Sequence, residues 1–129
     1  MKILIDTDIL LDVALGRENH LVDSVAVLQW VEAGGQACVA WHSLTNCAYL
    51  LKGGGRLFVN NLLKLVEVAP VGTDDAKRAL ILPMTDLEDA FQVAAALSWQ
   101  ADMIVTRNLS DYRKSPIVAL SPKNFLRLT

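Results

Sequence analysis

The sequence predicts an α/β fold, a three-layer sandwich with a central parallel sheet of four or five strands. Short apolar runs rich in β-branched residues alternate with longer segments of helical periodicity, which is typical of parallel sheets with crossover helices. Hydrophobic residues make up 53% of the chain, a share that suits a sheet covered on both faces. The length of 129 residues fits one domain with a single hydrophobic core.

The chain is expected to begin with a buried strand over residues 2–5, an apolar run that stops abruptly at Asp6. A short helix is expected over residues 8–14, ended by Gly16. The next helix is expected over residues 22–33, because apolar side chains recur on one helical face and a Gly-Gly pair follows.

The middle of the chain predicts a strand, a helix, a break and another helix. The strand is expected over residues 37–41, and Ser43 is a plausible N-cap for a helix that runs to Leu51. The glycine run 53–55 predicts a flexible break before a helix at about residues 57–65.

The following segment predicts a third strand over residues 66–71. A helix from Asp74 to Leu82 is expected next, capped by Thr73 or Asp74 itself. Asp86 is expected to cap the helix after that. The buried stripe of this helix should comprise Ala90, Val93, Ala94 and Leu97.

The last elements are strands over residues 103–106 and 117–120 and a terminal helix that Pro122 opens at its first position. In parallel sheets of this kind, ligands bind outside the carboxyl ends of the strands at a topological switch point. Polar side chains that follow the strands are therefore the candidates for a functional site.

Composition limits the function. The formal net charge of −2 excludes a strongly basic nucleic-acid binder but allows a local basic rim around an acidic site. Cys38 and Cys47 have no C-x-x-C pattern and indicate small buried residues in a reducing compartment. We find no targeting segment and no run that could span a bilayer, so we expect a soluble, cytoplasmic protein without membrane association.

Five residues with side-chain oxygens stand where strands and helices are expected to begin or end, and we predict that they converge: Asp6, Asn46, Asp89, Asn108 and Asp111. Three are carboxylates, and like charges crowded together are unfavourable unless a cation lies between them. Mg²⁺ and Mn²⁺ prefer hard oxygen ligands. The sequence therefore predicts a divalent metal site that performs phosphodiester chemistry.

The acids also have ordinary structural explanations. Asp6 has an alternative explanation as a cap of the following helix, but Asp8 is the expected cap, or else a group that hydrogen-bonds a water on the metal. The start of one helix is crowded with three acids, Asp86, Glu88 and Asp89. Acids in a first helical turn interact well with the helix dipole, which explains Asp86 fully. It explains Asp89 less well, because Asp89 shares the inward side of its helix with Val93 and a buried Asp needs a partner or a metal.

The loop after the fourth strand holds Thr106, Arg107, Asn108 and Asp111, and such residue types are common in turns. Arg107 is either a phosphate contact or a partner for the acids. Asn46 lies within a helical pattern, where its amide either serves the site or is buried and bonded to the backbone.

Other polar residues are expected to be structural. Asp12 is interpreted as a solvated carboxylate or a partner for Arg17. His20 and His42 lack the spacing of metal ligands.

Four segments together resemble the PIN-domain family: ILIDTDILLD, SLTNCAYLL, DLEDAFQVAAALSWQADMIVTRNLSDY and SPIVALSPKNFL. The most specific part is residues 86–112, a D-x-x-D-A helix with an alanine-rich face and then an apolar strand ending in T-R-N-x-x-D. The resemblance covers nearly the whole chain and implies a single PIN-like domain over residues 1–129. Many PIN domains of this size are toxins of a bacterial toxin–antitoxin pair, the VapC type.

The resemblance implies cleavage of single-stranded RNA that depends on Mg²⁺ or Mn²⁺ and leaves a 5′ phosphate and a 3′ hydroxyl. By position, Asp6 matches the family's first acid, Asp89 its helix acid and Asp111 the acid that closes the T-R-x-x-x-D segment. These three are the expected catalytic and metal-binding residues. The expected supporting residues are Asn46, Asn108, Asp8 and Thr106, and Arg107 is expected to contact the substrate.

Two positions depart from the family's pattern. Asn46 stands where the family often has Glu, and Asn108 where it often has Asp. Each amide keeps a carbonyl oxygen for a metal or its water but removes a negative charge. The departures put full metal affinity, or a second metal, in doubt.

Two rival functions stay open. One is a PIN fold that binds RNA or a protein partner but no longer cuts. The other is a phosphatase of the haloacid-dehalogenase type, because ILIDTDILLD has a strand-D-x-D shape, although the usual Gly-Thr does not follow. The resemblance also implies a small antitoxin as partner and a homodimer.

Overall fold

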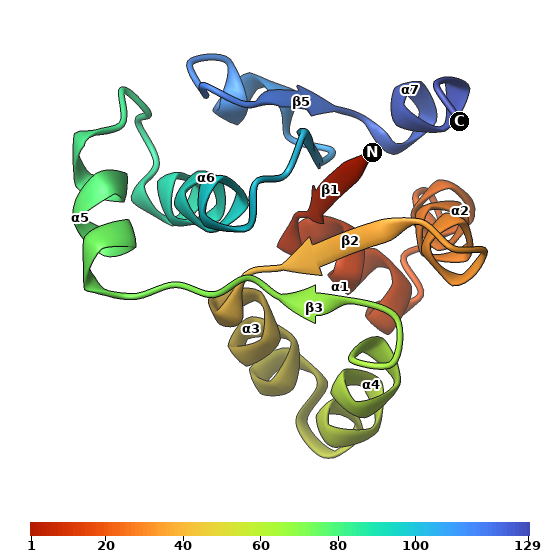
Figure 1. The fold of residues 1–129 in the computed structure, drawn as a ribbon. Coiled ribbons are helices and arrows are strands. Elements are labelled where there is room, and N and C mark those ends of the chain that lie inside the picture. The colour runs from red at the N-terminus through yellow and green to blue at the C-terminus, as the bar shows by residue number, and fades with distance from the viewer.

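The computed structural model describes residues 1–129, and Figure 1 shows a parallel sheet at its centre. Its strands are β1 (Lys2–Ile5), β2 (Gln36–Val39), β3 (Glu67–Val68), β4 (Met103–Val105) and β5 (Val118–Leu120). They pair in the order β3-β2-β1-β4-β5, all parallel. After β1, the chain adds β2 and then β3 on one side of it, and it then crosses to the other side to add β4 and β5. The switch point lies between β1 and β4.

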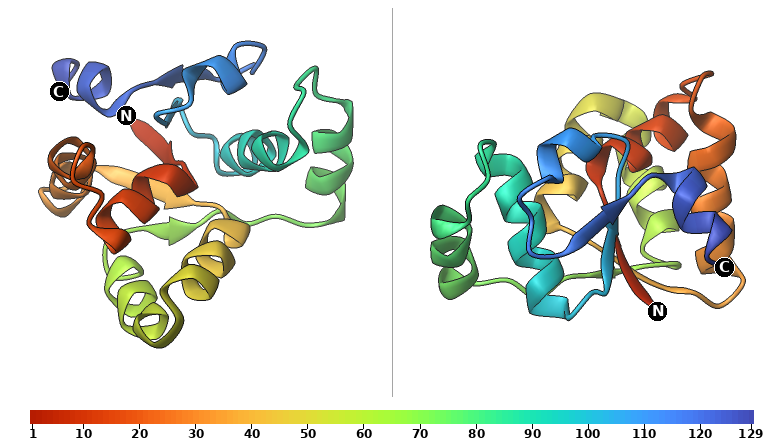
Figure 2. Two further views of the ribbon diagram at one scale, coloured as in Figure 1. Left: turned by 180° about the vertical axis from the view of Figure 1, so that it is seen from behind. Right: turned by 90° about the horizontal axis from the view of Figure 1, so that it is seen from above.

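The helices are α1 (Thr7–Leu15), α2 (Leu21–Glu32), α3 (Trp41–Leu51), α4 (Gly55–Leu62), α5 (Thr73–Ile81), α6 (Leu87–Trp99) and α7 (Pro122–Arg127), with short 3₁₀ turns η1 (Lys52–Gly54) and η2 (Leu109–Tyr112). Two faces of the sheet are covered, as Figures 1 and 2 show. The helix α6 packs on one face with α5 behind it, and α1, α2, α3, α4 and α7 cover the other. The predicted three-layer α/β class is confirmed.

Alternation along β1 divides the core between the two faces of the sheet. Ile3 and Ile5 belong to a cluster with side chains from α1, α2, α3, α4 and α7. Leu4 points to the opposite face, where it packs with Ile104 of β4 and Val93 of α6. All five of these side chains have no exposed surface. The central strand therefore contributes apolar side chains to both layers, as expected for a parallel sheet between helices.

Local sequence explains where the helices nearest the switch point begin and end. Asp6 is the N-cap of α1, and its Oδ1 accepts a hydrogen bond from the backbone N–H of Thr7. Gly16 ends this helix with a φ of 63°, a conformation that glycine adopts without strain. Asp86 caps α6 through its Oδ1, as predicted, and Pro122 stands at the first position of α7, also as predicted.

The start of α3 corrects the prediction. The strand β2 ends at Val39, Ala40 is the N-cap, and Trp41 is the first residue of the helix instead of the last residue of a strand. Ser43 was expected to cap the helix, but it lies within its first turn, fully buried, where its Oγ is 2.7 Å from the Oγ1 of Thr7. The hydroxyl bonds across to another helix instead of to its own backbone.

The glycine run and the third strand also differ from the prediction. Residues 53–55 continue the chain from α3 through η1 into α4, which ends at Leu62. Gly55 packs so closely on α3 that an added Cβ would lie 2.9 Å from the Cα of Ala48. Only residues 67–68 of the expected strand 66–71 pair with β2, although the N–H of Ala69 still donates to the carbonyl of Val39.

The cap of α5 differs as well. Its N-cap is Gly72, whose backbone N–H donates to Oδ2 of Asp75, and neither Thr73 nor Asp74 takes this role. None of the helices combines the length and the apolar character needed to cross a membrane.

Candidate metal site

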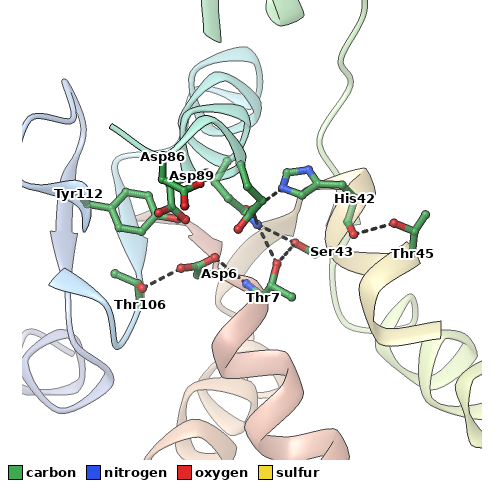
Figure 3. Close-up of polar contacts among 11 residues, drawn as sticks. Asp6, Thr7, His42, Ser43, Thr45, Asp86, Asp89, Thr106 and Tyr112 are labelled. Atoms are coloured by element: carbon green, nitrogen blue, oxygen red, sulfur yellow. Dashed lines mark hydrogen bonds and ion pairs between the residues drawn. The ribbon is translucent and has the colours of Figure 1, made fainter. Parts of the chain in front are cut away.

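The carboxyl ends of β1 and β4 bring two of the predicted site residues into direct contact. Asp6 follows β1 and Thr106 follows β4, and the Oγ1 of Thr106 donates to Oδ2 of Asp6 over 2.7 Å (Figure 3). The other oxygen of Asp6 accepts from the N–H of Thr7 over 2.7 Å. Asp6 is only 3% exposed. Residues 100 positions apart in the sequence are therefore joined at the switch point of the sheet.

Burial and like charges make ionisation of Asp6 unfavourable. The pKa of Asp6 is raised from 3.8 to about 7, mainly by burial and then by the negative charges of Asp8 and Glu88, while the hydrogen bonds from Thr106 and Thr7 act in the opposite direction. A buried carboxylate with acids nearby is the arrangement that a cation stabilises.

Asp89 lies in the first turn of α6 and is 7% exposed. Its Oδ1 accepts a hydrogen bond from the hydroxyl of Tyr112 over 3.3 Å. Burial and then the charges of Glu88, Asp86 and Asp111 together raise the pKa of Asp89 to about 7, and the hydrogen bond from Tyr112 limits the increase. Asp89 therefore points inward, as its position in the sequence predicted.

Tyr112 connects Asp6 and Asp89. It is 3% exposed, and its ring lies beside both carboxylates in Figure 3. Burial, followed by the charges of Asp6 and Asp89, raises the pKa of the Tyr112 phenol. The phenol thus stays protonated and donates to Asp89, next to Asp6.

A compact group of carboxylates surrounds the start of α6. Oxygens of Asp86, Glu88 and Asp89 all lie within 4.8 Å of one another. Asp89 is the one predicted ligand in this group, and Asp86 and Glu88 were interpreted as first-turn acids that favour the helix dipole. Glu88 is ionised readily, because its hydrogen bond from His42 lowers its pKa below 4.5 despite partial burial.

A buried polar network joins Glu88 to two other helices. Oε2 of Glu88 is 2.7 Å from Nε2 of His42, a residue in the first turn of α3. The Nε2 amide of Gln92 lies 3.3 Å from the same Glu88 oxygen and also donates to Thr7 and Ser43 over 2.8 and 2.9 Å. His42, expected only to be structural, thus contacts an acid of the candidate site.

Asp111 and Asn108 are exposed. Asp111 lines a polar hollow of about 370 Å³ together with Asp86 of the acidic group. Its charge contributes to the raised pKa of Asp89. Asn108 shapes the loop through its backbone, because its N–H donates to Oγ1 of Thr106 and its carbonyl accepts from the N–H of Asp111. The third predicted acid therefore lies at the rim of the site, on the side of Asp89.

Asp8 is held by the loop after β4. Its Oδ2 accepts from the backbone N–H of Arg107 over 3.0 Å, and the Thr106 hydroxyl is 3.4 Å away. Its Oδ1 is buried and has no hydrogen-bond partner. Burial raises the pKa of Asp8. Asp8 is therefore a further partly desolvated carboxylate next to Asp6, and Asp6, not Asp8, caps α1.

The guanidinium of Arg107 is paired with Asp12 of α1. Its Nε and Nη2 donate to the two oxygens of Asp12 over 2.6 and 2.9 Å, a bidentate pair. Asp12 has no exposed surface and is also bonded by Ser24 and approached by Arg17 at 3.5 Å. Arg107 thus has the second role considered for it, a partner for an acid. The expectation that Asp12 is solvated was wrong, and its pairing with Arg17 is confirmed.

Asn46 is exposed on α3. The alternative that its amide is buried and bonded to the backbone was therefore wrong. The α3 side chains that the structure does bring to the polar network are His42 and Ser43, in the first turn.

Several residues of the site were not singled out by sequence reasoning. Glu88 was noted only as one of three crowded acids, and Gln92 and Tyr112 were not considered. The crowding of Asp86, Glu88 and Asp89 was the available signal, because three acids exceed what a cap requires. A Gln on the inward stripe of α6 was a second signal, since a buried amide needs partners.

The residues fit a divalent cation of the Mg²⁺ or Mn²⁺ class. The donors are all hard oxygens, and three carboxylates approach within 4.8 Å. Two of the acids, Asp6 and Asp89, are buried beside other negative charges that raise their pKa to about 7. The compact group contains carboxylates alone, without the Cys and His ligands that are typical of zinc sites.

Comparison with known proteins identifies the fold. A family model described as PIN domain matches residues 2–110. No match was found among curated proteins. Solved structures with a similar fold include VapBC2 from Rickettsia felis bound to a DNA fragment from its promoter (13% identity, 94% of this chain and 98% of that chain, TM-score 0.73). They also include a toxin–antitoxin complex from Klebsiella pneumoniae (23% identity, 92% and 96%, TM-score 0.70) and VapBC-1 from nontypeable Haemophilus influenzae (14% identity, 95% and 99%, TM-score 0.68).

The family match extends from β1 into η2 and includes Asp6, the acidic start of α6 and the loop after β4. The fold and the family model therefore agree with the resemblance inferred from the sequence. The chain belongs to the PIN-domain family.

Proposed function

We propose that this protein is a metal-dependent endoribonuclease that cleaves single-stranded RNA and acts as the toxin of a toxin–antitoxin pair. The observation that carries the proposal is the pair of buried acids, Asp6 and Asp89, joined through Tyr112 and raised in pKa to about 7 by burial and neighbouring charges. Such a pair is unfavourable for folding and favourable for holding a divalent cation.

In this proposal, Asp6 and Asp89 hold the cation and Asp111 completes the acidic rim. A divalent cation bound there would polarise a phosphate oxygen and lower the pKa of a water molecule. Thr7 and Thr106 fix both oxygens of Asp6 by donating to them over 2.7 Å. Tyr112 orients Asp89, and Glu88 adds a negative charge beside it.

The test is a cleavage assay on single-stranded RNA with Mn²⁺, Mg²⁺ or EDTA. We expect cleavage with either metal, none with EDTA, and a loss of at least 100-fold in Asp6→Asn and Asp89→Asn. Asp74→Asn is the matched control, because Asp74 is an exposed acid in the first turn of α5. Unchanged cleavage in both site variants would reject the assigned roles.

The binding-module alternative is separated by calorimetry. Asn46 and Asn108 are exposed and uncharged, so the site has fewer acids than the family pattern. An active enzyme should bind Mn²⁺ below millimolar concentration, whereas a module that only binds RNA or protein should show no heat of binding. Trapping of an aspartyl-phosphate on Asp6 would instead favour a phosphatase.

The proposed partner is a small antitoxin protein, and the proposed assembly is a homodimer in the cytoplasm. The similar folds above come from complexes of a toxin with an antitoxin, which supports such a partner. Exposed apolar side chains on α3 and α4, including Trp41, Tyr49 and Leu57, offer a surface for it. Co-purification with the product of an adjacent short reading frame, and light scattering of the free chain, test the two statements.

A further inference from the structure

Gln92 is a fully buried polar side chain near the acids and has no role in the proposed chemistry so far. It lies in α6, one turn after Glu88, and has no exposed surface. Its Nε2 lies 2.8 Å from Oγ1 of Thr7, 2.9 Å from Oγ of Ser43 and 3.3 Å from Oε2 of Glu88. One amide therefore contacts side chains from the first turns of α1, α3 and α6.

The chemistry of these partners fixes the orientation of the amide. Glu88 is a carboxylate that accepts hydrogen bonds, and so the amide nitrogen must face it. The amide oxygen Oε1 is then left buried without a partner. An unpaired buried carbonyl is unfavourable, and an apolar side chain of the same size would avoid it. Gln92 is thus a poor choice for core stability alone, which indicates a role for its nitrogen.

The contacts of Gln92 lie one residue away from both buried acids. Thr7 is the neighbour of Asp6 and donates its N–H to Oδ1 of that residue over 2.7 Å. Glu88 is the neighbour of Asp89 and belongs to the same compact acidic group. The amide therefore links the two segments whose carboxylates must face the same cation.

The third contact extends the link to α3. The Ser43 and Thr7 hydroxyls are 2.7 Å apart, and both lie within 2.9 Å of the Gln92 nitrogen, so the three groups form a closed triangle (Figure 3 labels Thr7 and Ser43). His42, the residue before Ser43, bonds the same oxygen of Glu88 over 2.7 Å. Glu88 is thus held from two sides, by α3 and by Gln92.

We propose that Gln92 is a positioning residue of the metal site: its buried amide holds the first turns of α1, α3 and α6 together, so that Asp6 and the Glu88–Asp89 pair present their oxygens to one cation. This inference rests on the proposed metal-dependent function. Gln92 touches neither RNA nor the cation and acts only through Thr7, Ser43 and Glu88. Groups that orient metal ligands in this way typically change metal affinity 10- to 100-fold when they are removed.

The test replaces Gln92 by Met, which has a similar length and no hydrogen-bonding nitrogen. Val93→Ala is the matched control, because Val93 is the next residue of α6, fully buried in the apolar core and outside the polar network. Both variants should lower Tm. Isothermal titration calorimetry with Mn²⁺, at a temperature where all proteins are folded, should show a Kd at least tenfold higher in Gln92→Met and unchanged in Val93→Ala.

RNA cleavage gives an independent readout. In Gln92→Met, cleavage at limiting Mn²⁺ should fall at least tenfold and recover toward the wild-type rate as Mn²⁺ is raised, since the ligands themselves remain. Ser43→Ala, which removes one partner and keeps the amide, should shift the Mn²⁺ affinity in the same direction by less, and it serves as the test if Gln92→Met does not fold.

The outcomes separate the two claims. A Kd for Mn²⁺ in Gln92→Met within twofold of the wild-type value, with only a lower Tm, would overturn the positioning role and leave the proposed nuclease intact. An equal weakening of Mn²⁺ binding in Val93→Ala would also overturn it, because general loosening of α6 would then explain the effect. Failure of the wild-type protein to bind Mn²⁺ would reject the proposed function and this inference together.

Discussion

Replacing Asp6 by Asn should stabilise the metal-free protein at neutral and higher pH, although it removes a residue of the proposed active site. Asp6 is 3% exposed, and its pKa is raised from 3.8 to about 7, first by burial and then by the charge of Asp8. An Asn keeps an oxygen for the N–H of Thr7 and presents an amide to the hydroxyl of Thr106, so the local hydrogen bonds can persist.

The sign of the effect follows from proton binding. Between pH 4 and 7 the folded protein holds a proton on Asp6 that the unfolded chain has lost, so stability falls as pH rises through this range and the loss is complete above pH 7. At about 1.4 kcal/mol per pKa unit, a shift from 3.8 to about 7 corresponds to at most about 4 kcal/mol. The Asn variant avoids this loss.

The assay is urea or thermal unfolding in EDTA from pH 4 to pH 8.5. The Asp6→Asn protein should exceed the wild type by up to about 4 kcal/mol at pH 8, which is on the order of 10 °C in Tm, and the two should converge near pH 4. Asp74→Asn, at an exposed position, should change stability by less than about 0.5 kcal/mol at any pH.

Adding metal should narrow the gap between the two proteins. Wild type should gain about 2.7 kcal/mol when Mn²⁺ is present at 100 times its Kd, and the Asn variant should gain far less. Two results would refute the reasoning that burial of the ionised Asp6 destabilises the folded protein. One is a stability difference between Asp6→Asn and wild type that does not depend on pH. The other is an Asp6→Asn protein that is less stable than wild type at pH 8 in EDTA.

Three further changes test the packing around the site, each by urea unfolding. Arg107→Met should cost about 3–5 kcal/mol, because it leaves the fully buried Asp12 without its bidentate partner, and a loss below about 1 kcal/mol would contradict that pairing. Gly55→Ala should cost about 1–3 kcal/mol, because the new Cβ would meet the Cα of Ala48 at 2.9 Å, and a neutral or stabilising result would show that α3 and α4 can separate freely. Phe125→Ala should cost about 3–5 kcal/mol, because the ring is fully buried, and a loss under about 2 kcal/mol would mean that the core collapses into the space.

Local sequence signals located the elements well where one residue type decides the backbone. Asp6 stops β1, Gly16 ends α1 and Asp86 caps α6, all at the expected places, whereas the cap of α1 is Asp6 and not Asp8. The boundary between β2 and α3 was misplaced because Trp41 suits a strand and Ser43 suits a cap. Tertiary contacts decided otherwise: Ser43 is buried against α1, and the chain turns at Ala40.

Prediction of the site met a similar limit. Asp6 was recognised from the parallel-sheet rule and Asp89 from its inward position on a helix, and both are buried. The roles of Glu88 and Gln92 depend on partners 46 to 85 residues away, and no local pattern encodes such contacts. From the sequence, Arg107 could contact a substrate phosphate or pair with an acidic side chain. The structure decides between these two assignments, because the buried Asp12 is the partner of Arg107.

The distribution of charge among the acids explains why two of them stand out. Glu88 receives a hydrogen bond from His42 that lowers its pKa, so it remains negative and raises the pKa of Asp89 and, less strongly, that of Asp6. The hydrogen bonds that keep Glu88 ionised therefore make ionisation of Asp89 and Asp6 less favourable. Without a cation, the folded protein avoids this repulsion by binding protons on Asp89 and Asp6 near pH 7. If the site holds a cation as proposed, the same carboxylates would be its ligands, and protons and metal should compete for them across the physiological range of pH.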